Sequence, residues 1–227
     1  MLDTGGYFMG VSSWTVYSAA PEIQLTFFLI VRGPNYEVLI MKIDVHAHLF
    51  SPAYIRSLER IFGNDNSPAG LDAMRVIRWM NSDRRMIDVE GRLEEMARFD
   101  IEMQVLSVPF HGALVNDHTA AAELTHLAND VLVEAAHNHP QHFRALLVMP
   151  LQFPELAVEE LDRFAGRSEV VGVIIAGSAA GRQLNDSAFM PFYAELERRG
   201  LPFLLHPISP PCDWCMPEFS NVIRASR

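Results

Sequence analysis

Apolar runs alternate with amphipathic stretches along most of the chain, beginning near Met41. Short, nearly continuous apolar runs predict buried strands. These runs cover 41–47, 103–108, 143–149, 170–176 and 202–206. Between them, apolar residues recur at helical spacing and predict helices. The predicted helices cover 88–99, 118–138, 154–166 and 187–199. Strands that alternate with helices are typical of βαβ units, so we expect parallel pairing of consecutive strands.

The ends of the predicted helices carry residues that such positions favour. Asp88 suits the N-cap of the first helix and Pro154 suits the first turn of the third. Two arginines followed by Gly200 suit the end of the last helix. The polar, irregular stretch after the first strand contains Gly63–Pro68, and we interpret it as a long loop with short helical pieces.

Two architectures fit this order of elements, a (β/α)8 barrel and an open, doubly wound sheet. A dinucleotide site has no support, because no Gly-x-Gly-x-x-Gly motif follows a predicted strand. The residues with candidate chemistry stand at strand ends, which is where barrel enzymes place their active sites.

The first predicted strand carries an Asp-x-His-x-His motif that begins at Asp44. His46 and His48 are two residues apart, so on a strand they face the same side, among apolar neighbours. Two imidazoles in a sheltered place suit a divalent metal ion. His206 ends a later apolar strand and offers a third nitrogen, so we expect the three imidazoles to converge within about 4–5 Å. The alternative is that these histidines are packed core residues without a ligand.

Composition narrows the classes of function. The chain has 227 residues, a formal net charge of −10 and 49% hydrophobic residues. A substantial core is therefore expected, and binding to nucleic acid or to an anionic membrane is not. Cys212 and Cys215 form a lone Cys-x-x-Cys, whereas a zinc ribbon needs a second pair. We interpret this pair as incidental and expect reduced thiols in the cytoplasm.

Residues 1–40 lack a clear period and differ in pattern from the rest of the chain. Their apolar run at 23–31 is too short to cross a bilayer and lies too deep for a signal peptide, but it is a candidate strand. We expect 1–40 to be an N-terminal extension outside the core fold. Residues 41–227 would then form the main domain.

Several stretches, taken in order, resemble the amidohydrolase superfamily. Within it they are similar to the amidohydrolase-related branch that contains aminocarboxymuconate-semialdehyde decarboxylase and other aromatic-acid decarboxylases. The similar stretches are Met41–His48, Arg92–Met96, Val105–Ser107, Phe143–Pro150, Leu156–Leu161, Val171–Val173, Leu184–Asp186 and Leu201–Pro207. The resemblance implies an α/β fold, a TIM-type (β/α)8 barrel that is incomplete here because the chain supplies about five βα units.

The resemblance also implies site residues. His46, His48 and His206 would bind a divalent metal ion, for which we expect zinc, and Asp44 would support the strand instead of binding the metal. Arg75 would bind a substrate carboxylate, which its planar guanidinium matches. The alternative for Arg75 is an ordinary surface arginine.

The implied function is a metal-dependent decarboxylase or hydrolase acting on a small aromatic or unsaturated carboxylic acid. The family's barrel has eight strands and uses a further histidine and an aspartate from its later strands, which we do not find here. We therefore expect a C-terminally truncated chain, and the alternative function is an inactive fragment. His111, just after the second predicted strand, is a candidate for the acid/base role. A homodimer is one candidate assembly.

Overall fold

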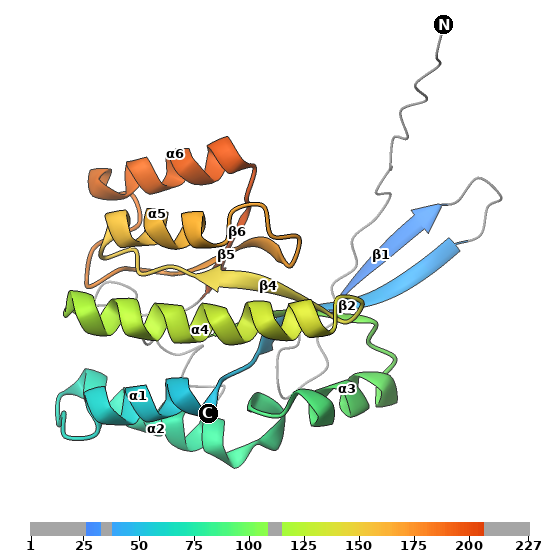
Figure 1. Ribbon diagram of the computed structural model, residues 1–227, viewed down its shortest axis with the longest axis horizontal. Coiled ribbons are helices and arrows are strands. Elements are labelled where there is room, and N and C mark those ends of the chain that lie inside the picture. Colours follow the sequence, from blue (N-terminus) through green and yellow to red (C-terminus); the bar gives the residue numbers. More distant parts are fainter. Residues whose placement is uncertain (1–25, 33–37, 109–114, 207–227) are drawn as a thin grey trace, which may run out of the picture.

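The computed structural model describes residues 26–32, 38–108 and 115–206 (Figure 1). Its centre is a six-stranded sheet whose spatial order follows the sequence, β1-β2-β3-β4-β5-β6. Strands β2 to β6 pair in parallel, and β1 pairs antiparallel with β2. The strands are β1 (Thr26–Arg32), β2 (Val38–His48), β3 (Met103–Ser107), β4 (Phe143–Val148), β5 (Val170–Ala176) and β6 (Phe203–His206).

The five parallel strands confirm the predicted barrel-type order and form a half-barrel. The order never reverses, whereas a doubly wound sheet reverses at a switch point. The first of the five begins at Val38, earlier than the predicted Met41. The other four match their predicted bounds to within one residue.

Strand β1 lies within the segment that we expected outside the core fold. Its register with β2 runs from Thr26 opposite Asp44 to Arg32 opposite Val38. The candidate strand at 23–31 is therefore present, shifted slightly along the chain, and it joins the sheet. The boundary between an extension and the main domain after residue 40 stays a prediction.

Helices cover the outer face of the parallel strands (Figure 1). Helix α4 packs on β4 and against α1, while α5 lies beside α6. The helices are α1 (Pro52–Phe62), α2 (Pro68–Ser82), α3 (Val89–Arg98), α4 (His118–Asn138), α5 (Pro154–Arg163) and α6 (Met190–Arg199). Short 3-10 turns precede α3 and α6, namely η1 (Arg84–Met86) and η3 (Ser187–Phe189). All four predicted helices are present.

The stretch after β2, predicted as a long loop with short helical pieces, is more helical than expected, because it contains the full helices α1 and α2. Both helices begin with a serine N-cap followed by proline: the Ser51 hydroxyl accepts from the Tyr54 amide at 3.1 Å, and the Ser67 hydroxyl accepts from the Gly70 amide at 3.2 Å. Proline suits the first turn because its missing N–H would lack an intrahelical partner there. These Ser-Pro pairs are helix start signals that mark where the two helices begin.

The core lies between the strands and this helical layer. Leu106 of β3, Phe143 of β4 and Val173 of β5 have no exposed surface, and neither has Leu132 of α4, the helix that packs on β4. Burying one such side chain contributes about 1.5–3 kcal/mol relative to leaving it in water. The core therefore fixes the strands whose ends carry the candidate site.

Among the described residues, no helix is both long enough and apolar enough to cross a membrane.

Candidate metal centre

Three histidines from two distant strands meet at the carboxyl ends of the parallel strands. His46 and His48 end β2, and His206 is the last residue of β6. One ring nitrogen from each lies within 4.8 Å of the other two. The ring centroids are 4.8 Å apart for His46–His48, 5.0 Å for His46–His206 and 5.5 Å for His48–His206. The predicted convergence is confirmed for the nitrogen atoms.

This convergence depends on the curvature of the sheet. Strands β2 and β6 are four steps apart in the sheet order. With neighbouring strands about 4.8 Å apart, a flat sheet would separate them by roughly 19 Å. Because the imidazoles of His46 and His206 nearly touch, the sheet must bend so that both point into its concave side. The barrel-like curvature thus builds the site.

A β-bulge on β2 includes the first histidine of the pair. Asp44 pairs with Gln104 and Ala47 pairs with Leu106, so the stretch from Asp44 to Ala47 is one residue longer on β2 than its partner on β3. Bulges of this kind re-aim side chains and recur beside active sites. His46 lies within the bulge, where the alternation of an ideal strand does not hold.

Both histidines of β2 favour the neutral state. Burial lowers the pKa of His46, although the nearby Asp44 carboxylate acts in the opposite direction. Burial also lowers the pKa of His48 to well below its usual range, and the neighbouring His46, His206 and Arg92 add to this, against a hydrogen bond to the Ser107 backbone. A neutral imidazole keeps one nitrogen lone pair, which is what a metal ligand needs.

Asp44 supports the strand that carries the histidine pair. Its carboxylate accepts a 3.0 Å hydrogen bond from the backbone N–H of His46 and another of 3.0 Å from the Gln104 side chain on β3. Asp44 is only 2% exposed. A buried carboxylate needs such partners, and here they fix the backbone that carries His46.

A buried arginine completes this polar layer. The Arg92 guanidinium donates to the Gln104 side chain at 3.0 Å, to the Arg85 carbonyl at 2.6 Å and to the His48 carbonyl. Burial lowers the pKa of Arg92 to about 10, while the nearby Asp44 carboxylate favours its charge. One side chain of α3 therefore ties together the end of β2, strand β3 and η1.

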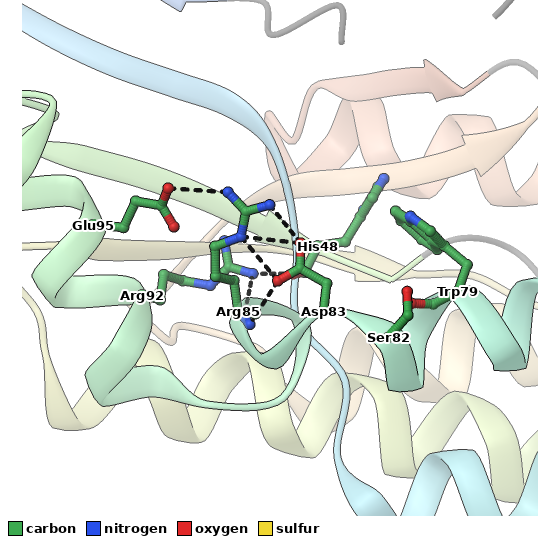
Figure 2. A network of polar contacts seen from close by, with 7 residues as sticks. All are labelled: His48, Trp79, Ser82, Asp83, Arg85, Arg92 and Glu95. Carbon is green, nitrogen blue, oxygen red and sulfur yellow. Dashed lines mark hydrogen bonds and ion pairs between the residues drawn. The ribbon is translucent and has the colours of Figure 1, made fainter. Parts of the chain in front are cut away.

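The turn that Arg92 holds is itself braced by ion pairs (Figure 2). Figure 2 shows Arg85 between two carboxylates, with Arg92 directed to the backbone of His48. Arg85 contacts Asp83 at 2.5 Å and Glu95 at 3.0 Å. These contacts join η1 to α3 next to the candidate site.

The residues present fit a divalent metal ion. Three imidazoles are a donor set that zinc and related ions accept, and two of the three favour the neutral form that metal binding requires. The polar layer beneath them supplies the outer partners that usually hold metal ligands in place.

The roles of the other predicted site residues stay predictions. Arg75 lies on α2 with an exposed side chain, and its carboxylate-binding role stays a prediction. His111, Cys212 and Cys215 fall outside the described residues.

Sequence reasoning missed Gln104, Ser107 and Arg92. The first two are the polar residues of an otherwise apolar predicted strand, and a polar side chain in such a run signals a buried hydrogen bond. Arg92 stands four residues before Met96, so the two share the buried face of α3. A charged residue on an apolar helix face is the corresponding signal.

Comparisons with known proteins place the chain in a family. A sequence profile described as amidohydrolase matches residues 43–226. The gamma-resorcylate decarboxylase of Rhodococcus jostii is 31% identical over 143 residues, which is 58% of this chain and 44% of that protein. The 2-amino-3-carboxymuconate-6-semialdehyde decarboxylase of Dictyostelium discoideum is 26% identical over 176 residues, covering 74% of this chain and 49% of its own.

A solved structure shows the same fold. The dihydroxybenzoic acid decarboxylase of Polaromonas, solved with bound manganese and 2-nitroresorcinol as inhibitor, superposes with a TM-score of 0.57 at 24% identity. The match covers 82% of this chain and 53% of the other. The chain spans about half the length of the curated relatives it matches. The profile match extends over most of the sequence and confirms the resemblance, so the chain belongs to the amidohydrolase family.

Proposed function

We propose that this chain binds a divalent metal ion through His46, His48 and His206, and that the ion serves the decarboxylation of a small aromatic carboxylic acid. The observation that carries the proposal is the convergence of three imidazoles from strands that are not neighbours in the sheet. The relatives from Rhodococcus and Dictyostelium are both decarboxylases, which supports the reaction class. Because this chain spans about half the length of those relatives, decarboxylation by the whole protein is also part of the proposal.

We propose zinc as the resident ion. Imidazole nitrogen suits zinc well, and three protein ligands with a further open position are typical of catalytic zinc sites. Manganese is the alternative, because the Polaromonas structure holds that ion. Competition between the two ions for the purified protein distinguishes them.

We assign metal binding, support of the metal ligands and proton transfer to different residues of this chain. When bound, the ion acts as a Lewis acid that draws electron density from a substrate oxygen. Asp44, Gln104 and Arg92 hold the backbone that presents the histidines. We assign Arg75 the substrate carboxylate. The ring carbon that loses CO2 must gain a proton, and His111 is our candidate for its donor.

The test compares three versions of the protein for metal content, metal affinity and turnover. His206→Ala removes one ligand, and His142→Ala removes an exposed histidine elsewhere. We expect wild type and His142→Ala to bind one ion alike, and His206→Ala to bind at least about 100-fold more weakly, since losing a ligand costs more than losing its outer partner. Turnover is followed as CO2 released from gamma-resorcylate.

The outcomes separate the parts of the proposal. Metal-dependent CO2 release that His206→Ala abolishes supports both the site and the reaction. Hydrolysis of esters or amides without CO2 release would instead favour a hydrolase at the same site. Equal metal binding by wild type and His206→Ala would contradict the metal centre itself.

A further inference from the structure

Ser107, the last residue of β3, lies against one edge of the His48 ring. Its side-chain oxygen is 2.9 Å from His48 Nδ1, and the residue has no exposed surface. The same oxygen donates to the Ala47 carbonyl at 3.2 Å. The Ser107 carbonyl accepts from the Leu49 amide at 3.1 Å. Ser107 is therefore fixed against β2 on both sides of His48.

This arrangement favours one of the two ring nitrogens of His48 as the one that carries the proton. A serine hydroxyl has one proton, and here it is directed to the Ala47 carbonyl. With its proton engaged there, the oxygen would meet His48 Nδ1 through a lone pair, and Nδ1 would be the donor. Nε2 consequently keeps its lone pair, and it is the nitrogen on the far side of the ring from Ser107.

We propose that Ser107 is a positioning residue that fixes His48 as its Nδ1–H tautomer and so leaves Nε2 free for the metal ion. The inference rests on the proposed metal centre, because the tautomer matters only if His48 is a ligand. Metal-binding histidines generally donate their second ring N–H to an oxygen partner, and loss of that partner weakens metal binding by about 10–100-fold. The assignment gives a role to a buried serine that the donor set alone leaves unexplained.

Ser107→Ala tests the proposal through two measurements. Long-range ¹H–¹⁵N spectra of ¹⁵N-histidine-labelled, metal-free protein report the protonated nitrogen of each ring. They are recorded at about pH 8, above the ordinary histidine pKa of about 6.5, and His48→Gln assigns the signals. We expect His48 of wild type to carry its proton on Nδ1 and Ser107→Ala to show a mixture. The Ser107 backbone carbonyl, which also accepts from the His48 ring, remains in this variant, so we expect the metal Kd to rise by about 10-fold, the low end of the range.

Two further variants separate positioning from folding. Ser107→Thr keeps the hydroxyl, and we expect it to retain the Nδ1–H signature and to bind metal within about threefold of wild type. Ser57→Ala is the matched control: it removes a buried serine hydroxyl of α1 that donates to Glu123 of α4 at 2.6 Å. It should lose stability to a similar extent while leaving His48 and the metal Kd unchanged.

Two results would contradict the role proposed for Ser107. A wild-type His48 protonated on Nε2 would overturn the proposal. So would a Ser107→Ala protein that loses only unfolding free energy, with tautomer and metal Kd both unmoved. If wild type binds no metal, the proposed function fails, yet the spectra of the metal-free protein still decide whether Ser107 fixes the tautomer. If Ser107→Thr does not fold, Ser107→Ala and Ser57→Ala carry the test.

Discussion

The two halves of the metal centre are held in place by different means. His46 and His48 lie at the end of β2, which has a neighbouring strand on each side. Buried side chains of β2, β3 and α3 brace them: Asp44 of β2 is 2% exposed and Ser107 of β3 is fully buried. His206 ends β6, a four-residue strand that has one neighbouring strand, β5, among the described residues.

Burial follows the same division. On β6, Phe203 is 51% and Leu205 is 52% exposed, whereas the β3 residues from Gln104 to Ser107 are all buried. An edge strand with exposed apolar side chains has less packing to hold it in place. We infer that the β2 half is preformed and that the β6 half depends more on the ion. Substitutions and metal removal can test this difference.

The largest expected effect comes from removing the cation of the braced half. Arg92→Met would leave the buried Asp44 carboxylate without its nearby positive charge and the carbonyls of Arg85 and His48 without a donor. Removing one partner of a buried charge pair costs about 3–5 kcal/mol, so we expect a loss of this size in unfolding free energy by urea denaturation. Arg98→Met, an exposed site on the same helix, should cost less than about 0.5 kcal/mol.

A double variant sharpens this result. If the loss arises from the stranded carboxylate, Arg92→Met combined with Asp44→Asn should recover part of the stability, because neighbouring residues couple in double-mutant cycles. Purely additive losses would show that Arg92 and Asp44 do not act together.

Metal removal should affect the two halves unequally. A ligand present at about 100 times its Kd stabilises the folded state by about 2.7 kcal/mol, so chelation should lower the melting temperature of the loaded protein. Hydrogen exchange should then accelerate more at the amides of β6 than at those of β2, since β2 keeps its polar layer without the ion. Equal acceleration in both strands would refute the difference between the halves, and His206→Ala should show no response to the chelator.

Much of the fold could be predicted from the sequence because local signals agreed with the global pattern. The run from His118 to Asn138 has apolar residues at helical spacing and ends just before a proline, and its predicted bounds are those of α4. After β2 the prediction was less accurate. The helix start signals there, Ser51 and Ser67, stand beside polar and glycine residues that are typical of loops. The helical pieces expected there are therefore longer than predicted, two capped helices of 11 and 15 residues.

The candidate site was predictable only in part. His46, His48 and His206 stand out because histidine is uncommon in apolar strands and because all three lie at strand ends. Arg92, by contrast, acts through carbonyl groups, which leave no trace in a sequence, and its partner Gln104 is brought close by strand pairing. Contacts of this kind depend on three-dimensional placement that periodicity does not encode.

A smaller effect is expected where β5 approaches the start of β6. A Cβ placed on Gly172 would lie 2.6 Å from the Pro202 carbonyl oxygen, a backbone atom that cannot turn aside. Gly172→Ala should therefore push β6 away, cost about 1–3 kcal/mol of unfolding free energy and weaken metal binding through His206. Gly91→Ala on α3 is the control, because its Cβ would meet only the Asp88 side chain at 3.1 Å. An unchanged metal Kd in Gly172→Ala would show that β6 is held more firmly than we infer.

The smallest effect concerns the polar contacts of Glu169, which tie the start of β5 to α4. Glu169, just before β5, contacts His137 at 2.8 Å and Arg167 at 3.2 Å, and hydrogen bonds from its own backbone N–H and then from these side chains lower its pKa to about 2. A carboxyl whose pKa is depressed in the folded state stabilises the fold fully above its ordinary pKa of 4.5. It loses that contribution as the pH falls towards 2.

Glu169→Gln should thus cost about 0.2–1 kcal/mol of unfolding free energy at neutral pH by urea denaturation, as surface pairs do. The difference from wild type should shrink below pH 4.5. Glu134→Gln, an exposed site on α4, should show no such pH dependence. A difference that stays constant down to pH 3 would show that the Glu169 carboxylate does not stabilise the fold through its charge. A changed metal Kd in Glu169→Gln would show that the start of β5 is coupled to the site.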